Sequence, residues 1–115
     1  MVRSRVTIDL TAVRDNVRRL REIVAPASVW VVVKADGYGH GAIDVGRAAI
    51  AAGAEVLCVA TVGEGQALRD ALGRDPRVLV LGPTCPAEQR VARESLLELA
   101  LLADGPVPEG IAVHL

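Results

Sequence analysis

Short apolar runs recur along the chain, and segments with helical spacing of apolar residues separate them. Val29–Val33 is an unbroken apolar run with four valines, too short for a helix and rich in β-branched side chains. Such a run is typical of a strand that is buried on both faces of a sheet. Further strands are predicted at Val6–Leu10, over residues 55–60, 77–81 and 97–102, and from Ile111 to Leu115.

The segments between these runs have the spacing and the end signals of helices. Thr11 has the chemistry of an N-cap, and apolar residues recur every three or four positions from 13 to 24. Gly53 and Gly73 are expected to close two of the later helices, and Pro86 stands in the first turn of another. The later helices are predicted over residues 42–52, 64–72 and 86–94.

This alternation of strands and helices predicts an α/β fold with a parallel sheet and right-handed crossovers. We predict a partial (β/α)8 barrel of the TIM type, roughly its first half, over residues 1–115. A complete barrel takes roughly 250 residues. Residues 103–110 are polar and rich in Pro and Gly, and they are fewer than the dozen or so that a parallel crossover needs. We therefore expect the crossover helix to be missing there.

The candidate functional site lies where the apolar run 29–33 ends. Lys34 follows the run, and a loop with a glycine at every second position begins after it. A desolvated lysine amine attacks carbonyl groups, and glycines let backbone N–H groups approach an anion such as phosphate. Tyr38 could donate its hydroxyl to the same anion. Pyridoxal phosphate, a carbonyl compound with a phosphate, would use all three features. A lysine that reaches to solvent before an ordinary glycine turn fits the bare pattern equally well.

The ten residues Val32–Gly41 resemble the cofactor-attachment signature of alanine racemases. By this resemblance, Lys34 is the catalytic lysine that carries pyridoxal 5′-phosphate, and Tyr38 contacts the phosphate of that cofactor. The likeness covers nearly the whole chain as far as about Leu102. It is carried by Arg5–Leu20, Cys58–Glu64, Ala67–Arg69 and Val78–Gly82.

The resemblance implies the interconversion of L- and D-alanine for cell-wall precursors, by full-length enzymes that are homodimers. Racemisation needs a proton-transfer group on each face of the α-carbon, and the second group of the family is a tyrosine in the C-terminal domain of a partner subunit. Tyr38 is the only tyrosine here, so we expect that second group and that second domain to be absent. We expect a truncated form with little activity alone, in which Asp36 caps a turn and His40 holds the loop.

Two alternatives remain open. One is a different pyridoxal phosphate-dependent racemase or decarboxylase of the same barrel class, and the other is a non-catalytic protein that binds this cofactor. The residues Tyr38–Gly41 argue against the decarboxylases and against the non-catalytic proteins, because in both classes the loop after the lysine is different.

Composition argues against several other classes. The 13 basic and 14 acidic residues give a net charge of −1, so no basic excess favours nucleic acid or an anionic membrane. No apolar run reaches the roughly 18 residues of a membrane span, and no signal core follows the N-terminus, so a cytoplasmic location is expected. Cys58 and Cys85 lack metal-ligand spacing, and Cys58 is expected in the core. No metal is predicted.

Overall fold

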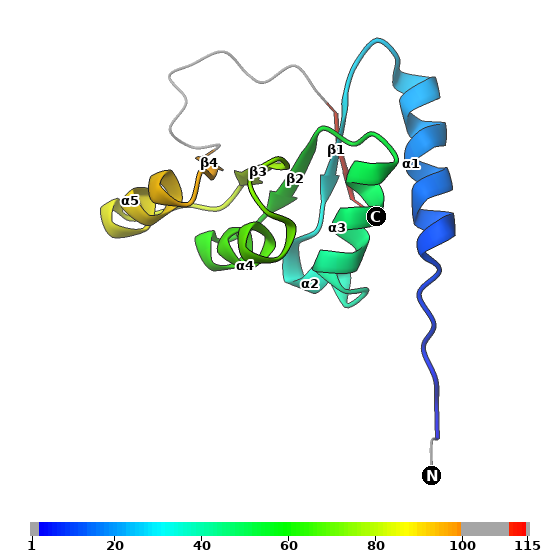
Figure 1. Ribbon diagram of the computed structural model, residues 1–115, viewed down its shortest axis with the longest axis horizontal. Coiled ribbons are helices and arrows are strands. Elements are labelled where there is room, and N and C mark those ends of the chain that lie inside the picture. The colour runs from blue at the N-terminus through cyan, green and yellow to red at the C-terminus, as the bar shows by residue number, and fades with distance from the viewer. Residues whose placement is uncertain (1–2, 100–110, 115) are drawn as a thin grey trace.

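The computed structural model describes residues 3–99 and 111–114. The elements are α1 (Leu10–Val24), β1 (Val29–Val32), α2 (Lys34–Tyr38), α3 (Ala42–Ala51), β2 (Val56–Val59), α4 (Val62–Leu72), β3 (Arg77–Val80), α5 (Pro86–Glu94), β4 (Glu98–Leu99) and β5 (Ile111–His114). The strands form one five-stranded sheet in the order β4-β3-β2-β1-β5, in which every neighbouring pair is parallel. In Figure 1, α1 lies at one side of the molecule and α5 at the other, and β1, β2 and β3 follow one another between them.

The central strands are buried as their apolar runs predict. Every residue of β1 and β2 is buried, and in β3 only Arg77 is exposed. Successive side chains of a strand point to opposite faces of the sheet. Each central strand therefore contributes to two apolar layers.

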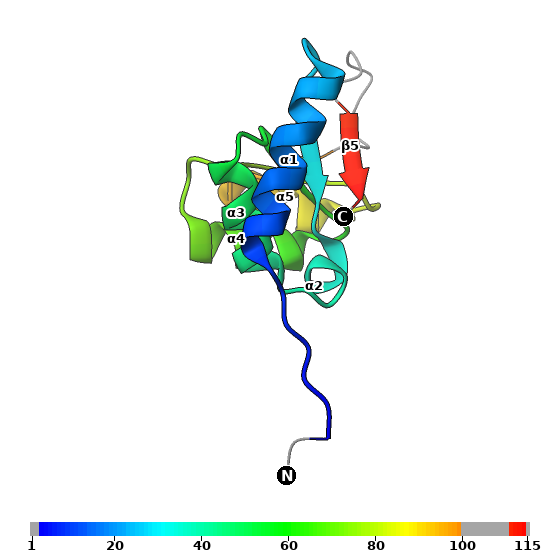
Figure 2. The same cartoon turned by 90° about the vertical axis from the view of Figure 1, so that its right-hand side faces the viewer.

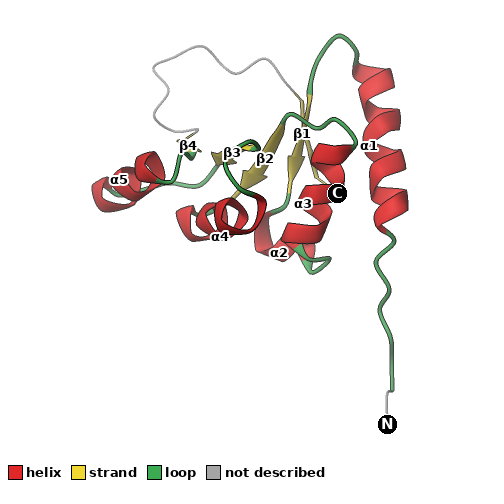
Figure 3. Cartoon of the chain, viewed as in Figure 1, coloured by secondary structure: helices red, strands yellow, loops and turns green. Residues whose placement is uncertain are grey.

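One layer lies between the sheet and the helices, which line one side of the strands in Figure 3. Alternate residues of β1, namely Val29, Val31 and the adjoining Val33, pack there with helical side chains such as Val17 and Leu68. Other members are Val45, Ala49, Leu57, Val59, Val62, Val78, Val80, Ala92 and Leu97.

The opposite face of the sheet carries a smaller cluster of Trp30, Val32, Val56, Cys58 and Leu79, here called the inner cluster. Trp30 is 6% exposed and donates its indole N–H to the Ser28 hydroxyl at 2.9 Å. Burial, together with the negative charge of Glu98, raises the pKa of the Cys58 thiol to about 11. Cys58 is thus a core residue, as predicted.

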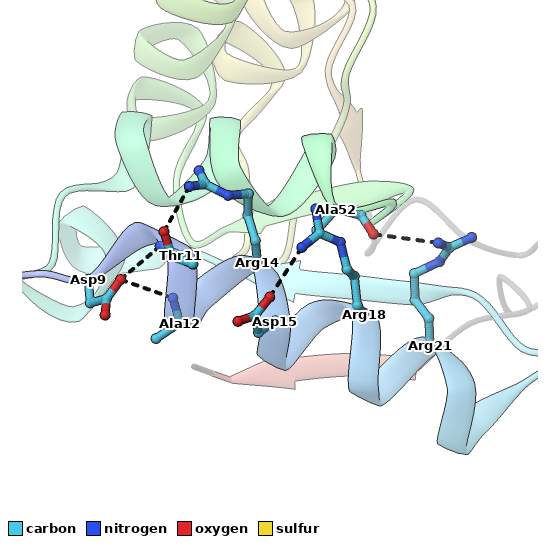
Figure 4. Close-up of polar contacts among 8 residues, drawn as sticks. All are labelled: Asp9, Thr11, Ala12, Arg14, Asp15, Arg18, Arg21 and Ala52. Atoms are coloured by element: carbon cyan, nitrogen blue, oxygen red, sulfur yellow. Dashed lines mark hydrogen bonds and ion pairs between the residues drawn. The ribbon is translucent and has the colours of Figure 1, made fainter.

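The predicted strand at Val6–Leu10 is wrong. Residues 3–9 extend away from the body of the molecule (Figures 1 and 2), and Val6 is 84% exposed. Leu10 already belongs to α1, because the Asp9 carboxylate accepts the amides of Thr11 and Ala12 at 2.9 and 3.1 Å (Figure 4). Asp9, and not Thr11, is therefore the N-cap.

The later strands agree with the prediction in part. β4 comprises only Glu98–Leu99, and residues 100–102 of the predicted run lie outside the described residues, as does the 103–110 linker. The last strand is confirmed over Ile111–His114, but it pairs with β1 and not with β4 (Figure 2). Among the described residues, none of the helices is long and apolar enough to cross a membrane.

Arg69 joins the ends of several elements. Its guanidinium donates to the carbonyl groups of Gly73 and Pro76, which link α4 to β3, at 2.9 and 2.8 Å. It also donates to the carbonyls of Ser95 and Leu96, after α5, at 3.1 and 2.9 Å. One side chain therefore satisfies four carbonyl groups and fixes α5 against α4.

Candidate functional site

Lys34 lies directly at the carboxyl end of the buried strand β1. The strand continues into Val33, whose amide donates to the Cys58 carbonyl of β2 at 2.8 Å. Val33 is 1% exposed, whereas Lys34 is half-buried. The lysine therefore stands at the rim of the sheet, where parallel α/β proteins bind their ligands.

A left-handed turn follows the lysine, where the sequence suggested only a polar loop. Ala35, Asp36, Gly37 and Tyr38 have φ of 51°, 55°, 62° and 57°. The turn closes through the Gly37 amide, which donates to the Val33 carbonyl at 2.9 Å. L-residues in this conformation cost roughly 1–2 kcal/mol each. Strain of this kind is concentrated at functional sites.

Two polar side chains of the loop hold the loop itself. The Asp36 carboxylate accepts the amide of Ala42, the first residue of α3, at 2.9 Å. The ring Nδ1 of His40 lies 3.0 Å from the Gly37 carbonyl and donates its proton there. These contacts agree with the local roles expected for both residues. The geometry assigns neither of them to chemistry.

Glu64 completes the site, and the sequence interpretation missed it. It lies in the first turn of α4, where its Oε2 accepts the amides of Ala60 and Thr61 at 2.7 and 3.0 Å. Its Oε1 accepts the amide of Ala35, next to Lys34, at 2.8 Å. The Thr-x-x-Glu spacing signals the capping box. Nothing in the spacing signals the bond to Ala35, which is 29 residues away.

The pKa of Glu64 is lowered from its ordinary value of 4.5. Burial opposes ionisation, but the amides of Ala35, Thr61 and Ala60 and the charge of Lys34 together outweigh it. Glu64 and Lys34 therefore both lie at the carboxyl ends of neighbouring strands, and the charge of the lysine favours the ionised carboxylate.

Tyr38 ends the left-handed turn and is 37% exposed. A single turn of backbone separates it from Lys34, so an amine and a phenol belong to one short segment at the strand ends. Together they offer a nucleophile for a carbonyl carbon and a donor for an anion, which is the chemistry that pyridoxal phosphate requires. These residues therefore fit the cofactor.

The ends of β2 and β3 approach each other closely beside this segment. Gly82 donates its amide to the Ala60 carbonyl at 3.0 Å, and a Cβ at Gly82 would overlap that oxygen. Glycine is required here by space. The described residues contain no group of three His, Cys, Asp or Glu side chains that could hold a metal ion.

A separate hollow of about 440 Å³ lies at the opposite, amino ends of the strands. It is lined in part by Arg18, Arg21, Gly53 and Glu55 and includes neither Lys34 nor Tyr38. Its arginines are engaged: Arg18 pairs with Asp15 at 3.2 Å, and Arg21 donates to the Ala52 carbonyl at 3.5 Å (Figure 4). Gly53 closes α3 as predicted: it follows the C-cap Ala52 with φ of 100°, and the amides of Gly53 and Ala54 donate to the carbonyls of Ile50 and Ala49 at 3.0 Å.

Residues 8–102 match the profile of a protein family described as "Alanine racemase, N-terminal domain". The chain belongs to this family. The alanine racemase of Mycolicibacterium vanbaalenii is 50% identical over 106 residues, which are 85% of this chain and 27% of that protein. The alanine racemase of Streptomyces coelicolor is 46% identical over 106 residues, with 90% of this chain and 27% of that protein covered.

Solved alanine racemases share the fold of the chain. The structure from Streptomyces coelicolor matches with a TM-score of 0.75 and 47% identity over 80% of this chain and 25% of that one. The alanine racemase from Bartonella henselae, solved with covalently bound pyridoxal phosphate, matches with a TM-score of 0.76 and 30% identity, and the match covers 82% of this chain and 27% of that one. The alanine racemase from Bacillus anthracis, solved with bound L-Ala-P, matches with a TM-score of 0.77 and 36% identity, and the match covers 82% of this chain and 24% of that one.

The predicted partial (β/α)8 barrel is therefore confirmed. Parallel strands alternate with helices, and the matched structures are alanine racemase barrels, of which the chain covers a part. The chain spans about a quarter of the length of the curated relatives that it matches.

Proposed function

We propose that this chain is the N-terminal, lysine-bearing part of a pyridoxal 5′-phosphate-dependent alanine racemase. The observation that carries the proposal is the position of Lys34, the only lysine of the chain, at the carboxyl end of a buried strand. Membership of the alanine racemase N-terminal domain family supports the cofactor and the substrate. The two free cysteines, one buried and one exposed, favour a reducing compartment such as the cytoplasm.

Each site residue has a proposed task. Lys34 holds the cofactor through its amine and then moves the proton at the α-carbon of alanine on one face. Tyr38 donates its hydroxyl to the phosphate. When bound, pyridoxal phosphate supplies an electron sink that stabilises negative charge at the α-carbon.

The opposite face needs a second proton-transfer group, and Tyr38 is already assigned to the phosphate. By itself the 115-residue chain should therefore exchange the α-proton of alanine faster than it inverts the α-carbon. Loss of one such group usually slows a reaction by roughly 10²–10⁴-fold. Assembly into a homodimer stays a prediction.

Trapping of the cofactor tests the proposal directly. The chain is incubated with pyridoxal phosphate and reduced with borohydride, and the label is mapped by mass spectrometry. We expect the label at Lys34 in the folded chain, well above the level in urea and above that on the N-terminal amine. An equal level in the folded and unfolded chain would overturn the proposed cofactor site.

The substrate is tested by incubating L-alanine with the cofactor-loaded chain in D₂O. We expect deuterium at the α-carbon to depend on Lys34 and to be lost in Lys34→Ala. Release of carbon dioxide in place of α-proton exchange would indicate a decarboxylase instead.

A further inference from the structure

The carboxylate of Glu64 connects the ends of two strands. Its Oε1 accepts the amide of Ala35 at 2.8 Å, and its Oε2 accepts those of Ala60 and Thr61 at 2.7 and 3.0 Å. Ala35 follows Lys34 after β1, whereas the other two residues follow β2. One side chain therefore ties the backbone beside the lysine to the neighbouring strand end.

This arrangement requires two acceptor oxygens. A glutamine has a single acceptor oxygen, and its NH₂ group donates. Glutamine nevertheless serves in a capping box as well as glutamate does. A glutamine at position 64 would therefore keep the cap of α4 and lose the bond to Ala35.

The bond to Ala35 bears directly on the lysine, because that amide belongs to the peptide group that joins Lys34 to Ala35. Ala35 has φ of 51°, in the left-handed region that L-residues rarely adopt. Hydrogen bonds to ionised acceptors are about twice as strong as neutral ones. Glu64 thus holds this peptide plane in a conformation that the backbone alone disfavours.

Among the described residues, Glu64 is a group on another element whose charge interacts with that of Lys34. On its own loop, the Asp36 carboxylate is turned to the Ala42 amide and the His40 ring to the Gly37 carbonyl. On α3, Asp44 and Arg47 pair with each other at 3.4 Å. The lowered pKa of Glu64, to which the charge of Lys34 contributes, agrees with their proximity.

We infer that Glu64 is a positioning residue for Lys34. Its carboxylate fixes the Lys34–Ala35 peptide plane to the end of β2 and so sets the direction in which the amine is held. The inference rests on the proposed function and adds to it a residue outside the signature stretch.

Three variants of the 115-residue chain separate positioning from helix capping. Glu64→Gln removes the bond to Ala35. Thr61→Ala removes the hydroxyl that accepts the Glu64 amide at 3.2 Å and leaves the carboxylate in place. Glu88→Gln is the matched control, because Glu88 occupies the same position in α5 and accepts the Cys85 amide at 2.8 Å.

Two measurements are made on each variant. The first is hydrogen exchange at the Ala35 amide, followed by NMR. The second is the rate at which pyridoxal phosphate becomes trapped on Lys34 by borohydride. For Glu64→Gln we expect Ala35 exchange to accelerate roughly ten-fold or more and trapping to slow several-fold, with the circular dichroism spectrum unchanged. Thr61→Ala and Glu88→Gln should stay within about two-fold of wild type in the exchange rate and in the trapping rate, since both leave the bond between Ala35 and Glu64 intact.

The outcomes are distinguishable. Trapping at the wild-type rate in Glu64→Gln would overturn the inference and leave the proposed function standing. Equal slowing in all three variants would also overturn it, because the effect would then not depend on the bond to Ala35. Absence of label in the folded wild type would overturn the proposed function, and the role of Glu64 in that site with it.

Discussion

At the scale of single residues, two carboxylates set the geometry of the lysine loop. Asp36 accepts the Ala42 amide and so joins the loop to α3, while Glu64 accepts the Ala35 amide and joins it to β2. Neither carboxylate is needed to explain the fold of the strands, which is accounted for by apolar burial. Both carboxylates therefore hold the backbone that follows Lys34, which agrees with the role proposed for that lysine.

Tyr38→Phe should weaken binding of pyridoxal phosphate and leave attachment to Lys34 possible. A hydrogen bond to a charged group contributes about 1.5–3 kcal/mol, so the Kd should rise roughly ten- to a hundred-fold. The Kd is measured by absorbance titration of wild type and variant, with circular dichroism as the control for folding. An unchanged Kd would remove Tyr38 from the phosphate site.

Glu64 should make the stability of the fold depend on acid pH. Its pKa is lowered from 4.5 in the folded chain, so the unfolded chain binds the proton more tightly. The stabilisation is therefore present above pH 4.5 and is lost as the pH falls through the lower, folded pKa. Urea unfolding at neutral and acid pH should show the stability gap between wild type and Glu64→Gln closing on acidification. A gap that stays constant with pH would contradict this.

Lys34 and Tyr38 could be singled out from the sequence because their signals are local. A lysine that ends an apolar run, and a tyrosine among alternating glycines, lie within a single short stretch. Glu64 gave only a local capping signal, since its bond to Ala35 depends on two strands lying side by side. Contacts between distant segments were beyond the reach of spacing rules.

At the scale of elements, burial was easier to predict than boundaries. The buried strands β1, β2 and β3 lie inside their apolar runs, because continuous apolar character reports burial on both faces. The strand pattern at Val6–Leu10 failed for two reasons. Strand pairing needs a neighbour, which the described residues do not place there, and Asp9 starts α1 early.

The left-handed turn after β1 was predicted only as a loop. Of its residues, Gly37 alone is a type that adopts such a conformation freely. Ala35 and Asp36 adopt it because Glu64 and the α3 amide hold the loop from outside. The conformational preferences of the single residues therefore do not predict this left-handed turn.

Gly82→Ala should destabilise the fold where the ends of β2 and β3 meet. The added Cβ would overlap the Ala60 carbonyl oxygen, which is a backbone atom and cannot rotate away. Overpacking of this kind typically costs about 1–3 kcal/mol, measured as a lower free energy of unfolding in urea.

Gly63→Ala is the matched control for this prediction. A Cβ there would meet only the Thr61 hydroxyl at 3.9 Å, and alanine favours the helix over glycine. Equal stabilities of the two variants would contradict the close approach at Gly82.

At the scale of the whole molecule, the same strands hold two apolar layers. Along β1, Val29 and Val31 face the helices, while Trp30 and Val32 belong to the inner cluster. Both layers contain residues of β1 and β2, so neither layer can come apart while these two strands stay folded. We therefore expect the two layers to form one cooperative folding unit.

The helical layer and the inner cluster should therefore unfold together. Trp30 is the only tryptophan, so its fluorescence reports on the inner cluster alone, whereas far-ultraviolet circular dichroism reports chiefly on the helices. Coincident transitions from different probes are the signature of two-state unfolding. We expect the two urea curves to share one midpoint and one slope. A fluorescence midpoint at a lower urea concentration than the circular dichroism midpoint would contradict this. It would mean that the inner cluster unfolds first and that the helical layer keeps the sheet folded without it.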